Sequence, residues 1–397
     1  MENKKKYTDA YPNNAEGIKV ELDLAHSPYK ILAHEDLLRK YINGEKINPI
    51  HLRVGLTNSC NARCNFCNFH SKNEEDFYDN FDFSDALQTE LAIKFFTEFA
   101  HNGGKAITFC GSGECTIHPE YAPICDACNK AGLQIGLITN GITLINPDIL
   151  ECVCRTHTWV RVGMNAGSRE TYKLITNTCE QNFDSILEAV SKIRNNAVMN
   201  EFRIGMNFVI TLQNCNEIVK AAELCKKSGA HYLRFEPEFY TGLAHKSIST
   251  KLDDIQVLLD EARLFSDDNF EVSIPKLDRG EMTNTDVVEG DFTQCNYCNF
   301  VAALGADGCM YPCPQIHLNS EYGYGRAIDI GYNAWVDKGE KQFWQVLNGD
   351  RRTKCKTCYY RPQQELLSWL KNGKLDLEET LAEYKKNNKE TLHKNFV

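Results

Sequence analysis

The sequence contains no long apolar run. No segment approaches the roughly 20 apolar residues that a membrane-spanning helix needs. The first residues, Met1–Lys6, are polar and lead into further polar residues, so they do not form a secretory signal. We therefore expect a cytoplasmic protein without a membrane partner. The chain also contains no internal repeat and no low-complexity segment.

Basic residues are outnumbered by acidic ones. The chain has 44 lysines and arginines against 54 aspartates and glutamates, a net charge of −10 and an isoelectric point of about 5.6. An extended face that binds nucleic acid needs an excess of positive charge. We therefore expect no nucleic-acid partner, although a local basic patch is compatible with this composition.

Cysteine, in contrast, is abundant. The chain has 18 cysteines, which in a reducing cytosol are thiols and not a disulfide framework. Grouped cysteines are candidate metal ligands, and they fall between residues 60 and 67 and between residues 295 and 358. The others are expected to be mostly small buried hydrophobes. These are Cys110, Cys115, Cys125, Cys128, Cys152, Cys154, Cys179, Cys215 and Cys225.

Six short segments rich in β-forming residues alternate with amphipathic helices between about residues 50 and 236. One helix is expected to have Ser84 as its N-cap. This alternation predicts a parallel sheet with helices outside it, and six strands are too few for a closed eight-stranded barrel. The predicted fold class is therefore α/β, with a partial (β/α)6 barrel. Its strands are His51–Leu56, Lys105–Cys110, Gln134–Ile138, Trp159–Asn165, Arg203–Ile210 and Tyr232–Glu236.

The first cysteine group, Cys60-x3-Cys64-x2-Cys67, follows the first predicted strand. A cubane cluster has four irons and is usually held by four thiolates, so three local cysteines leave one iron open to another ligand. A zinc site that includes His70 is the alternative, but zinc sites more often use Cys-x2-Cys pairs. The spacing resembles the radical S-adenosylmethionine (SAM) superfamily. This resemblance implies a [4Fe–4S] cluster that binds SAM and cleaves it to a 5′-deoxyadenosyl radical.

The same resemblance assigns SAM-binding residues to the ends of the following strands. Gly111-Ser112-Gly113-Glu114 is similar to the superfamily's Gly-Gly-Glu element, which binds the amino group of SAM, with Ser112 in place of the middle residue. Asn140 belongs to a Thr-Asn-Gly sequence that is also common in the superfamily. Asn165, and less strongly Ser168, are expected to bind the ribose. The alternative is that Asn165 only caps the helix that begins near Arg169.

The second cysteine group resembles the SPASM and twitch auxiliary-cluster domains. It contains Cys295-x2-Cys298, then Gly308-Cys309-x3-Cys313, then a distant Cys355-x2-Cys358. Two fully ligated cubanes would need eight thiolates, so these six cysteines favour a single auxiliary [4Fe–4S] cluster, the twitch-like form. A zinc ribbon is the alternative. The resemblance implies the ligands Cys295, Cys313, Cys355 and Cys358, with Cys298 as an alternative to Cys295.

These features divide the chain into five predicted parts. Residues 1–48 are an N-terminal extension, and residues 49–245 are the radical SAM partial barrel. Residues 246–290 supply a linking helix and strand. Residues 291–362 form the auxiliary domain, and residues 363–397 form a charged helical tail that covers the core or mediates assembly.

The resemblance implies a radical SAM oxidoreductase. We expect the radical to take a carbon-bound hydrogen from a polar small molecule, namely a sugar, an aminocyclitol or a nucleotide-linked sugar. In such a dehydrogenation the auxiliary cluster accepts the second electron, and a flavodoxin- or ferredoxin-type protein is the electron donor. Glu236 and Glu238, after the sixth strand, are candidates to bind the substrate or are solvated carboxylates at the rim.

Three other functions stay open. Many SPASM proteins modify ribosomal peptides, although the short segment before His51 disfavours the N-terminal recognition domain that such enzymes often carry. A redox-neutral epimerase would use a thiol as hydrogen donor, for which Cys110, Cys115 and Cys215 lie near strand ends. A non-catalytic iron–sulfur or zinc module is the third alternative.

Overall fold

The computed structural model describes residues 27–69, 79–238, 248–274, 295–323, 325–338, 360–388 and 391–397. Its centre is a nine-stranded sheet in the order β7-β6-β5-β4-β3-β2-β1-β8-β9. Neighbouring strands are parallel except β8 and β9, which are antiparallel. The strands are β1 (His51–Val54), β2 (Ala106–Phe109), β3 (Gln134–Thr139), β4 (His157–Gly163), β5 (Arg203–Ile210), β6 (Tyr232–Pro237), β7 (Glu271–Ser273), β8 (Val301–Leu304) and β9 (Met310–Tyr311).

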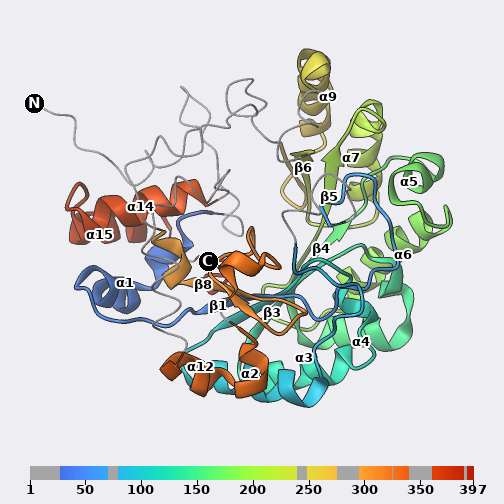
Figure 1. Cartoon of the computed structure of the whole chain (residues 1–397). Coiled ribbons are helices and arrows are strands. Elements are labelled where there is room, and N and C mark those ends of the chain that lie inside the picture. Colours follow the sequence, from blue (N-terminus) through green and yellow to red (C-terminus); the bar gives the residue numbers. More distant parts are fainter. Residues whose placement is uncertain are drawn as a thin grey trace, which may run out of the picture.

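Helices cover the outer side of this curved sheet (Figure 1). Those of the barrel are α2 (Thr89–His101), α3 (Tyr121–Lys130), α4 (Pro147–Thr156), α5 (Arg169–Thr176), α6 (Asn182–Asn196), α7 (Ile218–Lys227) and α9 (Leu252–Arg263). The others are α1 (Glu35–Ile42), α11 (Ala327–Ile330), α12 (Tyr332–Lys338), α14 (Arg361–Lys371) and α15 (Leu377–Asn387). Short 3-10 helices are η2 (Lys30–Ala33), η3 (Cys115–Ile117), η4 (Ile142–Ile145), η5 (Cys215–Glu217), η6 (Ser249–Lys251), η7 (Tyr297–Asn299) and η8 (Ser320–Tyr322).

Each barrel strand buries one set of alternate side chains against the helices. In β1 these are Leu52 and Val54, which belong to the main hydrophobic core. The other alternate set points into the barrel, because successive side chains of a strand face opposite sides of the sheet. His51 and Arg53 of β1 and Arg161 of β4 belong to this inner set and line a cavity inside the barrel.

The predicted α/β fold with an open, mostly parallel sheet is confirmed. The observed β5 has the predicted bounds, and β1 and β4 end two residues earlier than predicted. The strands β8 and β9 extend the sheet beyond β1, although their sequence lies in the predicted auxiliary domain. The predicted domain boundaries at residues 245/246 and 290/291 lie outside the described residues.

The prediction that Ser84 caps a helix is wrong. The helix α2 begins at Thr89 and its N-cap residue is Gln88. Just before this helix, the N–H of Leu87 donates to the carbonyl of Leu56 at 2.9 Å, so this residue is bonded to the loop after β1 and not to the helix. Ser84 instead closes a turn on the carboxylate of Asp82. The prediction that Cys125 and Cys128 are structural fits the structure, since both are fully buried in α3.

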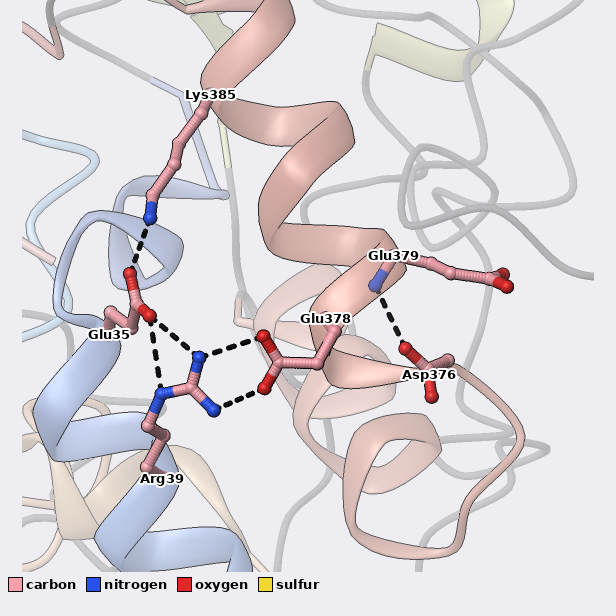
Figure 2. Close-up of polar contacts among 6 residues, drawn as sticks. All are labelled: Glu35, Arg39, Asp376, Glu378, Glu379 and Lys385. Atoms are coloured by element: carbon pink, nitrogen blue, oxygen red, sulfur yellow. Dashed lines mark hydrogen bonds and ion pairs between the residues drawn. The ribbon is translucent and has the colours of Figure 1, made fainter.

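The C-terminal tail wraps around the barrel and ends inside it. Figure 2 shows α15 tied to α1 by Arg39, which bridges Glu35 and Glu378, and by Lys385, whose Nζ lies 2.5 Å from Glu35. The last residues reach the middle of the curved sheet (Figure 1), where the carbonyl oxygen of Val397 lies 2.9 Å from Nδ1 of His51. In the described part of the chain, every helix is too short or too polar to cross a membrane.

Candidate active site

The first cysteine group lies on a loop at the carboxyl end of β1. Hydrogen bonds to two other parts of the chain fix this loop. At its beginning, the N–H of Asn58 donates to the carbonyl of Asp85 at 2.9 Å. Farther along, Arg63 and Asn65 donate to the carbonyls of Thr176 and Ile175, each at 2.9 Å. The loop is therefore held both by the segment before α2 and by the end of α5.

The three thiols of this loop are partly exposed and close enough to influence one another. Burial, together with the neighbouring Cys67 and Cys60, raises the pKa of Cys64 to about 12. Burial also raises the pKa of Cys60. Thiolates are the usual ligands of iron–sulfur clusters, and a positively charged metal group favours the deprotonated form of its ligands. The thiols of Cys60, Cys64 and Cys67 thus have the chemistry of three cluster ligands, although in this structure they do not converge on one point.

The loop after β2 packs directly on the cysteine loop. The N–H of Glu114 donates to the carbonyl of Ser59 at 2.9 Å, and Ser112 donates to the side chain of Asn58. An added Cβ at Gly113 would overlap the carbonyl oxygens of Thr57 and Ser59, so only glycine allows this approach. Gly111 has φ of +156°, which also favours glycine. Gly111 to Glu114 therefore lie beside the cysteine loop, and their contact with SAM stays a prediction.

The carboxylate of Glu114 is buried and accepts several hydrogen bonds. Its Oε1 accepts from the hydroxyls of Thr116 at 2.6 Å and Thr139 at 2.8 Å, and its Oε2 accepts from the N–H of Asn140 at 2.7 Å. The side chain of Asn140 in turn donates to Asn61 at 2.7 Å and lies 3.8 Å from the sulfur of Cys60. Glu114 and Asn140 thus join the ends of β2 and β3 to the cysteine loop.

Asn165 and Ser168 lie after β4 and have clear structural partners. Asn165 adopts a left-handed backbone with φ of 54°, and its side-chain oxygen accepts from the N–H of Val209 at 2.9 Å. The cap of α5 is Ser168, whose hydroxyl oxygen accepts from Thr171 and which also donates to Glu217 at 2.5 Å. The alternative that Asn165 caps this helix is therefore wrong. Its contact with the ribose of SAM stays a prediction.

The second cysteine group is described only in part, because Cys355 and Cys358 lie outside the described residues. Cys298 is buried in the main core, whereas Cys295 and Cys313 are partly exposed. Burial raises the pKa of Tyr297, and both Cys313 and Cys295 contribute to the rise, so the ring lies near both thiols. Among the described residues, no three His, Cys, Asp or Glu side chains converge on one metal ion. Which of Cys295 and Cys298 is a ligand stays a prediction.

A cavity of about 140 Å³ inside the barrel carries further candidate functional residues. Arg53, Arg161 and Tyr232 project into it from the strands, and Tyr297 and Tyr360 border it from the second half of the chain. The sequence reasoning did not single out these residues. The sequence feature that could have identified the two arginines is an arginine between two apolar residues of a strand, as in Leu52-Arg53-Val54 and Val160-Arg161-Val162. In a barrel covered by helices, such an arginine must face the interior.

A comparison of the sequence with known protein families gives one match. Residues 54–229 match the Radical SAM superfamily. The match runs from the end of β1 to just after α7. The matched segment contains the three cysteines of the first group and Gly111 to Glu114. A [4Fe–4S] cluster and SAM are the cofactors that such a match implies, and for this chain they stay a prediction.

Two relatives extend this comparison. The tungsten-containing aldehyde ferredoxin oxidoreductase cofactor-modifying protein of Pyrococcus furiosus is 23% identical over 318 residues, which cover 76% of this chain and 82% of that protein. A probable GTP 3′,8-cyclase of Saccharolobus islandicus is 28% identical over 199 residues, or 49% of this chain. The chain spans 60% of the cyclase's length.

Two solved structures share the fold. Streptococcus suis SuiB bound to S-adenosylmethionine superposes with a TM-score of 0.58 at 13% identity, covering 80% of this chain and 72% of SuiB. The protein anSMEcpe with bound AdoMet gives a TM-score of 0.52 at 18% identity, covering 85% of this chain and all 100% of the other. At these identities the similarity concerns the architecture around the radical SAM domain.

Proposed function

We propose that the protein is a radical SAM oxidoreductase that dehydrogenates a polar small molecule, with an auxiliary cluster accepting the second electron and a flavodoxin or ferredoxin supplying the first. The observation that carries this proposal is the direct contact between the cysteine loop and the loop of Gly113 and Glu114. Cys60, Cys64 and Cys67 would hold the cluster. With SAM bound, it would supply a 5′-deoxyadenosyl radical that takes a hydrogen atom from carbon.

Gly113 and Glu114 hold the cysteine loop and the loop after β2 in a fixed position relative to one another. Glu114 accepts hydrogen bonds from Thr116, after β2, and from Thr139 and Asn140 at the end of β3, and so ties these two strand ends together. Gly113 brings backbone carbonyls to the edge where an ammonium group would need acceptors. Such preorganised polar groups do not have to reorient when a charged ligand arrives.

The position of the cavity supports a substrate between two redox centres. On one side Arg53 lies close to the thiol of Cys110, which directly precedes Gly111. On the other side Tyr297 borders the cavity and lies near Cys295 and Cys313. A molecule bound there would lie between the radical SAM site and the second cysteine group. This arrangement suits a reaction that passes one hydrogen atom to one side and one electron to the other, with the hydroxyl proton of the substrate released to water.

The two curated relatives support a small polar substrate. One is named as a protein that modifies a cofactor and the other as a probable cyclase of GTP. We therefore extend to this chain a substrate of the size of a sugar, an aminocyclitol or a nucleotide-linked sugar. The similarity to SuiB concerns architecture at 13% identity, so peptide modification has less support.

A redox-neutral epimerisation is the second candidate, because Cys110 lies beside the cavity and could return a hydrogen atom. The test is a reaction of the reduced, reconstituted protein with SAM and candidate sugars in deuterated water. Dehydrogenation predicts one 5′-deoxyadenosine per oxidised product and no solvent deuterium on the reacting carbon. Deuterium on that carbon without net oxidation, lost in Cys110→Ala, would establish the epimerase instead.

A further inference from the structure

The cavity inside the barrel is bounded by strands at its sides and by the C-terminal tail. Phe396 and Val397 line it, and the tail is fixed there by the contact between Val397 and His51. Its volume of about 140 Å³ is close to the ~150 Å³ of an engineered cavity that accommodates benzene. The cavity therefore has room for one compact chemical group and not for an extended chain.

Positive charge dominates the lining of this cavity. Lys30, Arg53, Arg161 and Arg203 border it, and none of its described lining residues is an aspartate or a glutamate. Arg53 and Arg161 lie within electrostatic reach of one another. Like charges held close together repel one another. In the described part of the barrel, four cationic side chains thus border one cavity, beside the terminal carboxylate of Val397.

The arginines have incomplete partners inside the protein. The Nε of Arg53 is buried and has no hydrogen-bond partner among the described residues. The Nε of Arg161 donates only a long bond of 3.4 Å to the hydroxyl of Tyr232, and its guanidinium lies 5.8 Å from the ring centre of Trp159. Glu236 is within electrostatic reach of Arg161, but it forms an ion pair with Arg234 at 2.8 Å. Arg53 also contacts the thiol of Cys110, and its Nε is the donor that stays available for a further acceptor.

Glycines on the neighbouring strands make room for the aromatic walls of the cavity. An added Cβ at Gly136 would overlap the ring of Trp159, and one at Gly205 would overlap the ring of Tyr232. These rings occupy the space that ordinary side chains would fill. They shield the guanidinium groups from water, which strengthens any charge-assisted hydrogen bond formed there.

We infer that this cavity is an anion site, in which Arg53 and Arg161 hold a phosphate or carboxylate group of the substrate. The inference rests on the proposed function, because it names the group that anchors the proposed small molecule. Guanidinium groups match the two oxygens of either anion by paired hydrogen bonds. Anchoring at this depth leaves the rest of the substrate directed toward Cys110 and the SAM-binding loop.

The test is binding of small probes to the reconstituted, unreduced protein by titration calorimetry, without SAM. Inorganic phosphate and acetate are the anionic probes, and acetamide is the neutral match of acetate. We expect either anion to bind at least tenfold more tightly than acetamide. Arg161→Gln should weaken anion binding about tenfold or more, the effect of losing a charge-assisted hydrogen bond. Arg155→Gln removes an exposed arginine paired with Asp126 and should leave binding unchanged.

A second measurement separates a ligand role of Arg53 from a structural one. If the charge of Arg53 is unpaired until an anion binds, removing it costs the free protein nothing. Arg53→Met should then unfold at an equal or higher urea concentration than the wild type, and phosphate should no longer stabilise it. Tighter binding of phosphate identifies a phosphate ester and tighter binding of acetate a carboxylate, and both uphold the inference. Equal affinity for acetate and acetamide, or unchanged anion binding in Arg161→Gln, overturns it. Formation of 5′-deoxyadenosine by the wild type tests the proposed function separately.

Discussion

The carboxyl end and the interior of the barrel treat their polar groups in opposite ways. At the carboxyl end, the side chains of Glu114 and Asn140 accept and donate hydrogen bonds within the protein. In the interior of the barrel, Arg53 and Arg161 carry charge into a cavity whose described lining has no aspartate or glutamate. Polar groups whose hydrogen bonds are all made within the protein fix the shape of a site. Buried groups with unused donors instead favour the binding of a ligand that supplies acceptors. The polar groups at the carboxyl end therefore hold the two loops in place, whereas those of the interior are available to bind an anion.

The largest expected effect follows from removing the cysteine loop's thiols at the carboxyl end. In Cys60→Ala combined with Cys64→Ala, the reconstituted protein should hold about four irons fewer than the wild type, the content of one cubane. Cys128→Ala is the matched control, because this thiol is buried in α3 away from the loop. Iron and sulfide analysis after anaerobic reconstitution measures the difference. An unchanged iron content in the double variant contradicts the assignment.

The next effect concerns the network that makes the carboxyl end rigid. Glu114→Gln replaces one acceptor oxygen by a donor facing hydroxyl or backbone donors, and should lower the free energy of unfolding by about 2 kcal/mol. Glu120→Gln changes an exposed carboxylate nearby and should have little effect. Urea unfolding of both variants gives the comparison. Equal stability of Glu114→Gln and the wild type would show that this network does not hold the loops.

The amino end should make stability depend on pH. Burial lowers the pKa of His51 to about 3, against 6.5 for a free histidine. The unfolded chain therefore binds the extra proton between these values, and stability falls as the pH drops below about 6.5. At about pH 5 the loss is about 2 kcal/mol for this one group. His157, buried with a pKa of about 3, adds a similar loss.

The substitution His51→Gln isolates this contribution. It removes the titrating group, so the fall in unfolding free energy between about pH 7 and pH 5 should shrink by about 2 kcal/mol. His101→Gln alters an exposed histidine at the end of α2 and should leave the fall unchanged. Urea titrations at several pH values measure both slopes. If His51→Gln keeps the full fall, His51 is not buried in its neutral form.

The smallest effect is expected for the ion pairs on the outside of the barrel. Glu378 and Arg39 hold α15 against α1 (Figure 2), but both are exposed, and exposed ion pairs contribute little. Glu378→Gln should leave the urea midpoint within experimental error. A clear drop would mean that these pairs, and not the burial of Phe396, keep the tail in place.

The sequence was most informative where chemistry forces a local pattern. The spacing of Cys60, Cys64 and Cys67 and the glycines before Glu114 form a pattern that can be recognised without a structure. The strands were predictable because β-forming residues alternate with helical stripes. Their ends were not, since Leu56 and Leu87 pair through backbone groups that the sequence does not distinguish.

The inner side of the barrel was harder to predict, because it depends on contacts between distant segments. Arg53 and Arg161 looked like ordinary members of two strands, and only the closure of the sheet brings them together. The position of Val397 beside His51 joins residues 346 apart in the chain. The pairing of β8 with β1 is equally remote in sequence. No local signal reports such contacts.

One measurement tests the central claim most directly. The reconstituted protein is reduced with dithionite, incubated with SAM in the absence of substrate and analysed for 5′-deoxyadenosine, beside Cys64→Ala prepared in the same way. The account predicts 5′-deoxyadenosine from the wild type and none from the variant. A wild type that holds a reduced cluster and forms none, or a variant that forms as much, would contradict it.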